Sequence, residues 1–496
     1  MRRVESNNGK NKWAKWAALA PAEGPMPTKF GAALAHRAGP KYAYAIVFLG
    51  TLAKALSACG QTTFLGGVMD YIEADMKLRR STTSLLYSCA TLASSLTLPL
   101  LGFVMDRIGL RKSGCLNALL MALTCVVLGN LAREPAVLTL FFYLLRFFGQ
   151  GGMMLIGTNL ISNWWIGKRG LMQGISGVGL SLSMTGVFPV LARMSCERLG
   201  WRATFTAIGT FVAFAFVPIC WLFFLETPEL YGLKPDAAKV VESERAQGGR
   251  PKSDVGSVEG KTLREALRTI DFYAATLGGF VWAFNATGVF FHMVSIVETD
   301  LGGLEGSRAE GVLGSVYLTC AISSSVLTLL VGWAFDRINP KWIIVLGLLA
   351  QSLSIFLWSV DRSVRVTILS AGFFGFSNGC YNNMSGVVHA YLFGRKHIGK
   401  ISSVAYSSLV IGSALGPLPL GLIEAGNLQA QTRVMQYLCM PCVVVAGFAA
   451  CCKFRPLISR GGEDASSAGG AGEEEDVEMH RLLGVEEGSG DEDGKL

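Results

Sequence analysis

The sequence predicts an all-α membrane protein with 12 transmembrane helices in two six-helix bundles. Three observations predict this fold class: an apolar overall composition, twelve long apolar runs, and a polar stretch that divides these runs six from six. Of the 496 residues, 51% are hydrophobic and 16% are charged, and the mean hydropathy is +0.42. These values exclude an ordinary cytosolic enzyme and a mostly disordered chain.

The twelve predicted spans are justified by length, because a helix needs about 20 mostly apolar residues to cross a bilayer. The first six cover residues 42–69, 82–105, 113–132, 136–163, 171–193 and 203–225. The second six cover residues 272–297, 311–335, 342–360, 366–393, 401–423 and 434–452. The residues before the first span are basic and polar and lack the apolar core of a cleavable signal peptide.

These runs divide the chain into five regions. We predict a cytosolic basic N-terminal tail at 1–41, an N-terminal six-helix bundle at 42–225, a cytosolic connector at 226–270, a C-terminal six-helix bundle at 271–453 and a disordered acidic C-terminal tail at 454–496. The basic tail and the connector carry eight Lys or Arg residues each. Because Lys and Arg concentrate on the cytosolic side, both termini are predicted to be cytosolic.

The two bundles share sequence echoes. The segment GFVMDRI at 102–108 recurs as GWAFDRI at 332–338, after the second and eighth predicted spans. The segment WIGKR at 165–169, after the fourth span, is similar to FGRKH at 393–397, after the tenth span. Internal repeats of this kind are typical of secondary transporters, whose solute site lies between the repeats near the middle of the membrane.

The repeated loop resembles a known family signature. Gly102-x-x-x-Asp106-Arg107-x-Gly109-x-Arg111-Lys112 resembles the signature of the major facilitator superfamily of secondary transporters. Arg146-x-x-Gly149-x-Gly151 resembles its second motif, and the segments around 164–202 and 393–399 resemble the monocarboxylate porter and oxalate/formate antiporter group. The resemblance covers roughly residues 42–452 and implies the major facilitator fold and an alternating-access mechanism.

The resemblance also implies a conformational latch at the charged loops. Its predicted residues are Asp106, Arg107, Arg111, Lys112, Asp336 and Arg337. The alternative is plain anchoring by positive charge on the cytosolic side. A latch is favoured for Asp106, because a carboxylate in a tight basic loop needs a partner or a helix N-terminus.

Lys54 is the charge placed deepest in a predicted span. At 1.5 Å per residue, it lies roughly 18 to 22 Å from either edge of its helix, too deep to reach the interface easily. An isolated ammonium in hydrocarbon costs at least about 2.5 to 3.5 kcal/mol. We therefore expect Lys54 to face a watery cavity, a buried partner or an anionic solute. The alternative is a lysine bonded to neighbouring helices without touching solute.

Polar side chains form stripes on the first, fourth, seventh and tenth spans, which in the resembled family line the central cavity. The predicted solute-binding residues are Lys54, Ser57, Gln61, Arg146, Gln150, Asn285, His292, Asn378, Tyr381 and Asn382. Their spacings of three, four or seven residues place each set along one helical face. The alternative for each stripe is hydrogen bonding between helices, worth about 0.6 kcal/mol per contact.

Two deep cations without a carboxylate create a positive field, which favours an anion. The sequence thus predicts a secondary active or facilitative transporter of a small, monocarboxylate-like organic anion, by symport or antiport, with His292 as the obvious titrating group if protons are coupled. The alternatives are an exporter of amphipathic organic compounds and a non-transporting membrane sensor. No nucleophile–base or metal-ligand constellation is present, so no enzyme activity, cofactor, metal or nucleic-acid partner is expected.

The acidic tail contains a short sorting-like sequence. Glu478 followed by Leu482 and Leu483 resembles an acidic dileucine signal. It would imply a sorting adaptor as partner and delivery to the plasma membrane or a vacuolar or lysosomal membrane. The alternative is a chance occurrence in a polar tail.

Overall fold

The computed structural model describes residues 29–231, 233, 260–300, 307–361, 363–423 and 428–455, and they are almost entirely helical. All of them belong to one compact unit, Met1–Ala237 with Gly256–Leu457. Among these residues, nine helices are long and apolar enough to cross a membrane. The remaining predicted spans, the fifth, seventh and tenth, are helical as well. The predicted all-α membrane fold is confirmed.

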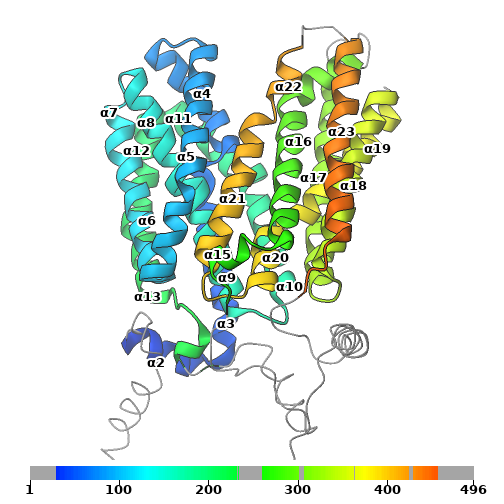
Figure 1. Ribbon diagram of the computed structural model, residues 1–496. Helices are drawn as coiled ribbons and strands as arrows, with labels where there is room; N and C mark the ends of the chain where they lie inside the picture. Colours follow the sequence, from blue (N-terminus) through cyan, green and yellow to red (C-terminus); the bar gives the residue numbers. More distant parts are fainter. Residues whose placement is uncertain are drawn as a thin grey trace, which may run out of the picture. The chain divides into compact units, whose positions relative to one another are not determined.

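The first half of the chain contains twelve helices among the described residues, drawn from blue to green in Figure 1. They are α2 (Lys29–Ala38), α3 (Tyr42–Leu56), α4 (Thr62–Met76), α5 (Arg80–Ile108), α6 (Leu110–Leu123), α7 (Gly129–Leu131), α8 (Pro135–Leu144), α9 (Met154–Trp164), α10 (Arg169–Ser181), α11 (Phe188–Leu199), α12 (Trp201–Phe211) and α13 (Val217–Phe223). Short 3₁₀ or π stretches join several of them: η1 (Gly39–Lys41), η2 (Ser57–Gly60), η3 (Thr124–Leu128), η4 (Leu145–Met153), η5 (Leu182–Val187), η6 (Val212–Phe216) and η7 (Pro228–Tyr231).

The second half is drawn from green to orange-red in Figure 1 and is also helical. Its helices are α15 (Leu263–Ala266), α16 (Ile270–Asp300), α17 (Ser307–Phe335), α18 (Pro340–Val360), α19 (Val364–Asn382), α20 (Met384–Phe393), α21 (Ile398–Leu415), α22 (Leu418–Gly421) and α23 (Leu428–Cys451). Large apolar side chains such as Phe48, Phe214 and Tyr437 are more than half exposed on the outside of these helices. Such a surface suits lipid, where the backbone polar groups are satisfied within each helix.

Most of each predicted tail, most of the connector and the sorting residues Glu478, Leu482 and Leu483 lie outside the described residues. The five predicted region boundaries therefore stay predictions. So do the cytosolic position of both termini and the destination membrane.

The first predicted span differs from a continuous helix. Helix α3 ends at Leu56, η2 follows, and Gln61 has an extended backbone before α4 begins. The break lies where Gly60 packs directly on η4, since a Cβ at Gly60 would collide with the carbonyl oxygen of Leu145. The helical stripe predicted from Lys54 through Ser57 to Gln61 is thus interrupted. The backbone changes from α-helical at Lys54 to 3₁₀-helical at Ser57 and extended at Gln61.

The fourth predicted span also changes its winding. It consists of α8, the π-helical η4 and α9. Arg146 and Gln150 both lie in η4. Single π-helical turns are rare and occur often at functional sites, because they re-aim the side chains that they carry.

Candidate functional site

Asp106, near the end of α5, caps the first turn of α21 in the other half. Its Oδ1 accepts a hydrogen bond from the Gly399 N–H at 2.8 Å, and its Oδ2 accepts one from the Lys400 N–H at 3.0 Å. A carboxylate is stabilised there by the positive end of the helix. The two helices lie side by side (Figure 1). Gly102 allows this close approach, because a Cβ at that position would collide with the Gly399 carbonyl oxygen.

Asp336, after α17, repeats this arrangement with the halves exchanged. Its Oδ1 accepts from the Gly170 N–H at 2.6 Å and its Oδ2 from the Leu171 N–H at 2.9 Å, both in the first turn of α10. Gly332 crosses Gly170 closely, since a Cβ at Gly332 would lie 2.7 Å from the Gly170 carbonyl oxygen. The repeated Gly-x-x-x-Asp sequence thus combines a close helix crossing with a cap on the helix that it crosses.

The basic residues predicted for the latch occupy different environments. Arg107 and Lys112 are exposed, whereas Arg111 is buried with its guanidinium 5.3 Å from the centre of the Trp221 ring. Arg337 is exposed and stacks on the indole four residues earlier, at 4.0 Å. The contacts of Asp106 and Asp336 described above go to backbone N–H groups, and the predicted network of side-chain charges stays a prediction.

Glu226, just after the sixth predicted span, caps α6. Its Oε2 accepts from the Leu110 N–H at 3.1 Å and its Oε1 from the Arg111 N–H at 3.4 Å. Burial raises the pKa of the Glu226 carboxyl, and the two N–H groups oppose this effect only in part. Because its folded-state pKa is raised, Glu226 stabilises the fold fully at pH values below the ordinary carboxyl range, and this contribution is lost as the pH rises through its pKa.

Replacing Glu226 with glutamine should make thermal stability less dependent on pH in the acidic range. The difference in melting midpoint, variant minus parent, should increase as the pH rises through the raised carboxyl pKa, because the neutral amide has no charge to bury. The measurement is the melting midpoint of detergent-purified protein between about pH 4 and pH 7. Glu265→Gln is the matched control: contacts with Thr262 lower the pKa of the exposed Glu265 carboxyl, so its difference should change in the opposite direction. A pH-independent difference for Glu226→Gln would contradict the expectation.

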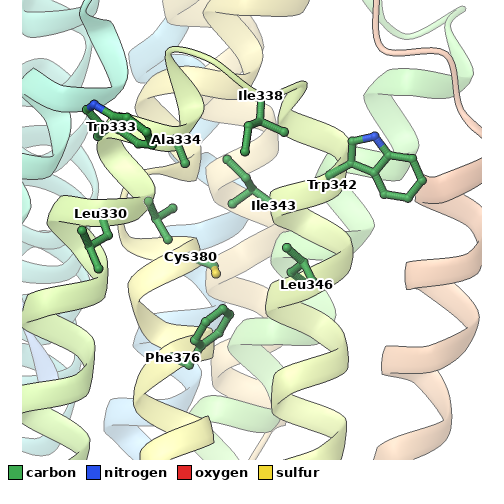
Figure 2. Close-up of a pocket in the computed structure, with 10 residues that line it drawn as sticks. Leu330, Trp333, Ala334, Ile338, Trp342, Ile343, Leu346, Phe376 and Cys380 are labelled. Atoms are coloured by element: carbon green, nitrogen blue, oxygen red, sulfur yellow. The ribbon is translucent and has the colours of Figure 1, made fainter.

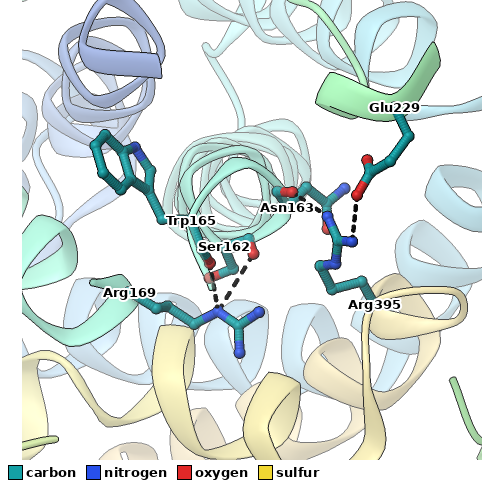
Figure 3. A network of polar contacts seen from close by, with 6 residues as sticks. All are labelled: Ser162, Asn163, Trp165, Arg169, Glu229 and Arg395. Atoms are coloured by element: carbon teal, nitrogen blue, oxygen red, sulfur yellow. Dashed lines mark hydrogen bonds and ion pairs between the residues drawn. The ribbon is translucent and has the colours of Figure 1, made fainter. Parts of the chain in front are cut away.

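A second polar cluster, drawn in Figure 3, joins the loop after α20 to the end of α9 and to η7. Arg395 is nearly buried; its guanidinium donates to the Asn163 carbonyl oxygen and forms an ion pair with Glu229 at 2.5 Å. Beside it, the Arg169 Nε donates to two carbonyl oxygens at the end of α9. The sequence analysis noted the echo that contains Arg395 and Arg169 but assigned no role to either residue.

Lys54 belongs to α3 and lies where this helix packs against α9 and α10, all within the first half. Its side chain is 4% exposed, and its Nζ donates a hydrogen bond to the Gln173 Oε1 at 2.6 Å. Gly157 makes room for it, because a Cβ there would lie 2.9 Å from the Lys54 Cγ. The ammonium thus has a neutral amide as its partner, and the described residues place no carboxylate within ion-pair distance of it.

Gln173 extends this contact across to the other half. Its Nε2 donates to the Thr158 carbonyl oxygen at 2.8 Å and to the Ser162 Oγ at 2.9 Å. The Ser162 hydroxyl in turn donates to the Gly386 carbonyl oxygen of α20 at 2.6 Å. The sequence analysis missed Gln173; the signal that could have found it is an amide side chain inside the apolar fifth span.

Arg146 forms a separate cluster in the first half. Its NH1 group donates to the Gly60 carbonyl oxygen at 3.1 Å and to the Thr62 Oγ1 at 3.2 Å, and its guanidinium lies 5.2 Å from the centre of the Tyr87 ring. The side chain is 3% exposed, and its Nε has no hydrogen-bond partner among the described residues. The Gln61 Nε2 donates a hydrogen bond to the Ser57 Oγ at 3.2 Å, so these two predicted site residues contact each other rather than Lys54.

Tyr406 of α21 brings the second half to this cluster. It lies against Gln150 and within electrostatic reach of Arg146. Tyr406 also lines a cavity of about 20 Å³ between α16, α19, α20 and α21. Sequence analysis missed Tyr406, because the eleventh span carries no charged or amide residue to mark it.

The two predicted solute-binding residues of the seventh span, Asn285 and His292, contact neighbouring helices. The Asn285 Nδ2 donates to the Leu438 carbonyl oxygen at 3.1 Å and to the Cys442 Sγ at 3.0 Å, both in α23. The His292 Nε2 lies 3.0 Å from the Pro417 carbonyl oxygen, at the break between α21 and α22. In a medium without water, a polar side chain bonds to the nearest backbone group of a neighbouring helix.

The tenth span divides its polar residues between two neighbours. Asn382 donates to Ser324 and Thr328 of α17, at 3.3 and 3.1 Å, and Asn378 lies against the same helix. Tyr381 turns the other way: its hydroxyl donates to a backbone carbonyl of α18, and its ring stacks on Trp282 with centres 5.1 Å apart. Of these three residues, only Tyr381 lines the 20 Å³ cavity.

A second cavity, of about 300 Å³, lies between α17, α18 and α19, and Figure 2 draws the side chains that line it. Its lining is apolar and includes Trp333, Trp342 and Phe376. Such a lining offers no group to orient a charged solute. The candidate site is therefore the pair of cationic clusters around Lys54 and Arg146, together with the small cavity beside Tyr406.

In the described part of the chain, no group of His, Cys, Asp and Glu side chains has the arrangement of a metal site.

Comparison with known proteins agrees with this architecture. The family model of the Major Facilitator Superfamily matches residues 51–417. An MFS-type transporter of Gibberella moniliformis is 24% identical over 372 residues, which are 73% of this chain and 80% of that protein. Among solved structures, the human organic anion transporter MFSD10 (TETRAN) has a TM-score of 0.58 at 16% identity, covering 83% of this chain and 99% of the other. The proton:xylose symporter XylE bound to 6-bromo-6-deoxy-D-glucose has a TM-score of 0.63 at 15% identity, covering 82% and 95%.

Proposed function

The chain belongs to the Major Facilitator Superfamily and is a membrane transporter of that type, and we propose that its solute is a small organic anion carried by alternating access. Within the anions, the resemblance of residues 164–202 and 393–399 to the monocarboxylate and oxalate/formate group favours a small carboxylate. The mechanism is secondary active or facilitative transport.

One observation carries the anion proposal: the buried ammonium of Lys54 has a neutral partner. The Gln173 amide supplies a hydrogen bond but no charge, so the field of the cation is not cancelled. Arg146, also buried, adds a second cation whose described partners are a carbonyl oxygen, a hydroxyl and an aromatic ring. At low effective dielectric, two such charges attract an anion strongly and repel a cation.

The alternating-access proposal is supported by where the two halves touch. The cross-half contacts of Asp106, Asp336 and Arg395 all involve the ends of helices and the loops that join them. Both carboxylates bind backbone N–H groups at the starts of helices in the opposite half. Separation of the halves at these contacts would open that end of the protein.

The fold alone does not choose the solute. The same architecture serves a protein named for organic anions and another named for proton:xylose symport. The alternative proposals are an exporter of amphipathic organic compounds and a membrane sensor without flux. An amphipathic solute would fit an apolar pocket better than the charged clusters around Lys54 and Arg146.

The test is a solute screen with the full chain in proteoliposomes. Labelled lactate, pyruvate and oxalate should show saturable uptake and exchange, whereas xylose and tetraethylammonium should not, because the buried field is positive. Transport of only the neutral or cationic probe would overturn the anion proposal. Saturable binding without flux would favour the sensor, and flux of amphipathic dyes alone would favour the exporter.

A further inference from the structure

The apolar cavity of about 300 Å³ between α17, α18 and α19 is a groove in the outer surface of the second half, here called the outer groove. Its walls include Leu330 and Trp333 of α17 and Trp342 and Leu346 of α18, which are between 47% and 56% exposed. Its floor includes the buried Cys380 of α19, and Figure 2 shows this side chain between the two walls. Because the walls are exposed and apolar, the outer groove opens towards lipid.

The outer groove begins where α17 and α18 meet at one end of the bundle. Helix α17 ends at Phe335 and α18 begins at Pro340, so Trp333 and Trp342 lie in the last and first turns. Tryptophan at the end of a membrane helix is typical of the interface between headgroups and hydrocarbon. Leu346 lies six residues into α18, roughly 9 Å deeper along the helix axis. The outer groove therefore extends from the level of the headgroups into the region of the acyl chains.

Two cations lie at the interfacial end of the outer groove, one on each wall. The Arg337 guanidinium stacks on the Trp333 ring at 4.0 Å, and its NH1 group donates to the Trp333 carbonyl oxygen at 3.4 Å. The Lys341 Nζ lies 5.0 Å from the centre of the Trp342 ring. Since both indoles line the outer groove, both charges are held beside its mouth.

Both cations keep hydrogen-bond donors for an anionic group. The Lys341 Nζ donates to the carbonyl oxygens of Ala450 and Cys452, at 3.3 and 3.1 Å, which uses two of the three donors of an ammonium. Arg337 is exposed, and its described hydrogen bond uses one of the five guanidinium donors. Within the described part of the chain, no carboxylate lies within ion-pair distance of either cation. A phosphate group would satisfy donors from both walls.

We propose that the outer groove binds one anionic phospholipid, with its phosphate at Arg337 and Lys341 and one acyl chain between α17 and α18. The chain gains packing contacts along the apolar walls, and the two charges select an anionic headgroup. A second copy of this protein is a poorer occupant, because a twofold interface centred here would bring these cations against the same cations of the other copy. The site takes a component of the membrane, so it is independent of the proposed solute.

The first test measures selectivity for the headgroup. The full chain is purified in detergent, stripped of lipid and titrated with phosphatidylglycerol or phosphatidylcholine of identical acyl chains, and native mass spectrometry counts the bound lipids. One phosphatidylglycerol should bind at least about tenfold more tightly than phosphatidylcholine. Arg337→Gln and Lys341→Gln should each lower this preference about fivefold. Lys396→Gln, at an exposed lysine in the loop after α20, is the matched control and should keep it.

The second test locates the acyl chain. Leu346→Trp should fill the outer groove and weaken phosphatidylglycerol binding roughly tenfold, because the chain loses its contacts with the walls. Leu353→Trp is the matched control: it lies two turns further along α18, is also exposed and does not line the outer groove. A phosphatidylglycerol with a photoactivatable group in one acyl chain should label the segment 330–346 in the parent and in Leu353→Trp, but not in Leu346→Trp.

The lipid proposal is overturned if the parent binds both lipids equally, or if the label is confined to other segments. It is also overturned if Leu346→Trp binds phosphatidylglycerol as tightly as Leu353→Trp does. A dimer mass that appears as bound lipid is lost would instead assign the outer groove to a second copy. If Leu346→Trp does not fold, Leu346→Phe replaces it with the same expectation. These results do not bear on the anion proposal, which the solute screen tests separately.

Discussion

Replacing Lys54 with alanine should reduce anion flux by about 10- to 100-fold while the protein remains folded. The reason is the loss of a charge-assisted contact to the solute, worth about 1.5 to 3 kcal/mol, at a factor of ten for each 1.4 kcal/mol. Folding should survive, because the substitution removes a partner only from the Oε1 of the neutral Gln173, whose Nε2 keeps its two hydrogen bonds. The measurement is the initial rate of labelled-anion exchange in proteoliposomes, normalised to reconstituted protein.

A second variant distinguishes a solute-binding lysine from a structural one. Gln173→Glu would place a carboxylate beside the Lys54 ammonium, which Gln173 now contacts at 2.6 Å. If Lys54 attracts the solute, this internal counter-ion should lower flux nearly as much as Lys54→Ala. If Lys54 only braces α3 against α10, the new ion pair should leave flux unchanged. Lys41→Ala, at an exposed lysine just before the same helix, is the matched control. If the Lys54→Ala variant transports the anion at the parental rate, the proposal that Lys54 binds the anion is wrong.

Replacing Asp106 with asparagine should loosen the end of the protein where the two halves meet. Asparagine keeps one acceptor oxygen but loses the charge that the N-terminus of α21 stabilises. A loss of about 1 to 2 kcal/mol corresponds to roughly a 5- to 30-fold rise in the ratio of open to closed protein. The measurement is hydrogen exchange of the backbone amides of Gly399 and Lys400 in lipid nanodiscs, which should accelerate by a similar factor.

The distant amides show whether Asp106 acts as a latch or only as a local cap. A latch holds the halves together, so Asp106→Asn should also accelerate exchange at Gly170 and Leu171, which Asp336 caps. A local cap would change only the first turn of α21. Asp361→Asn, at an exposed carboxylate after α18, should change neither region. Unaltered exchange at Gly170 and Leu171 would reject the latch for Asp106.

The repeated loop shows how far sequence reasoning reaches towards the site. The spacing of Gly102 and Asp106, and its recurrence at Gly332 and Asp336, marks these positions as a pair from the order of residues alone. The expectation that Asp106 needs a partner or a helix N-terminus agrees with the geometry, since its carboxylate caps α21. The spacing does not reveal which helix is capped, because that helix lies in the other half of the chain.

The tenth span shows a signal that was present but not used. Ser385 follows Asn382 by three residues, and a further step of four along the same stripe reaches His389. The sequence analysis instead chose His292 as the titrating group. In the structure His292 lies beside a backbone carbonyl, whereas His389 lines the small cavity. Depth in a span is visible in a sequence, but hydrogen-bond satisfaction is not.

By itself the sequence determined the fold class, and it predicted a twofold internal repeat and the depth of two cations in their spans. Each of these follows from local quantities: the length of an apolar run, the recurrence of a short segment, and the distance of a charge from the end of its helix. Only the tertiary structure decided that Lys54 meets Gln173, 119 positions away, that Asn285 faces α23, and that Tyr406 reaches Gln150. Those pairings depend on which helices cross and at what height, and crossings are set by glycine contacts and packing between segments far apart in the chain.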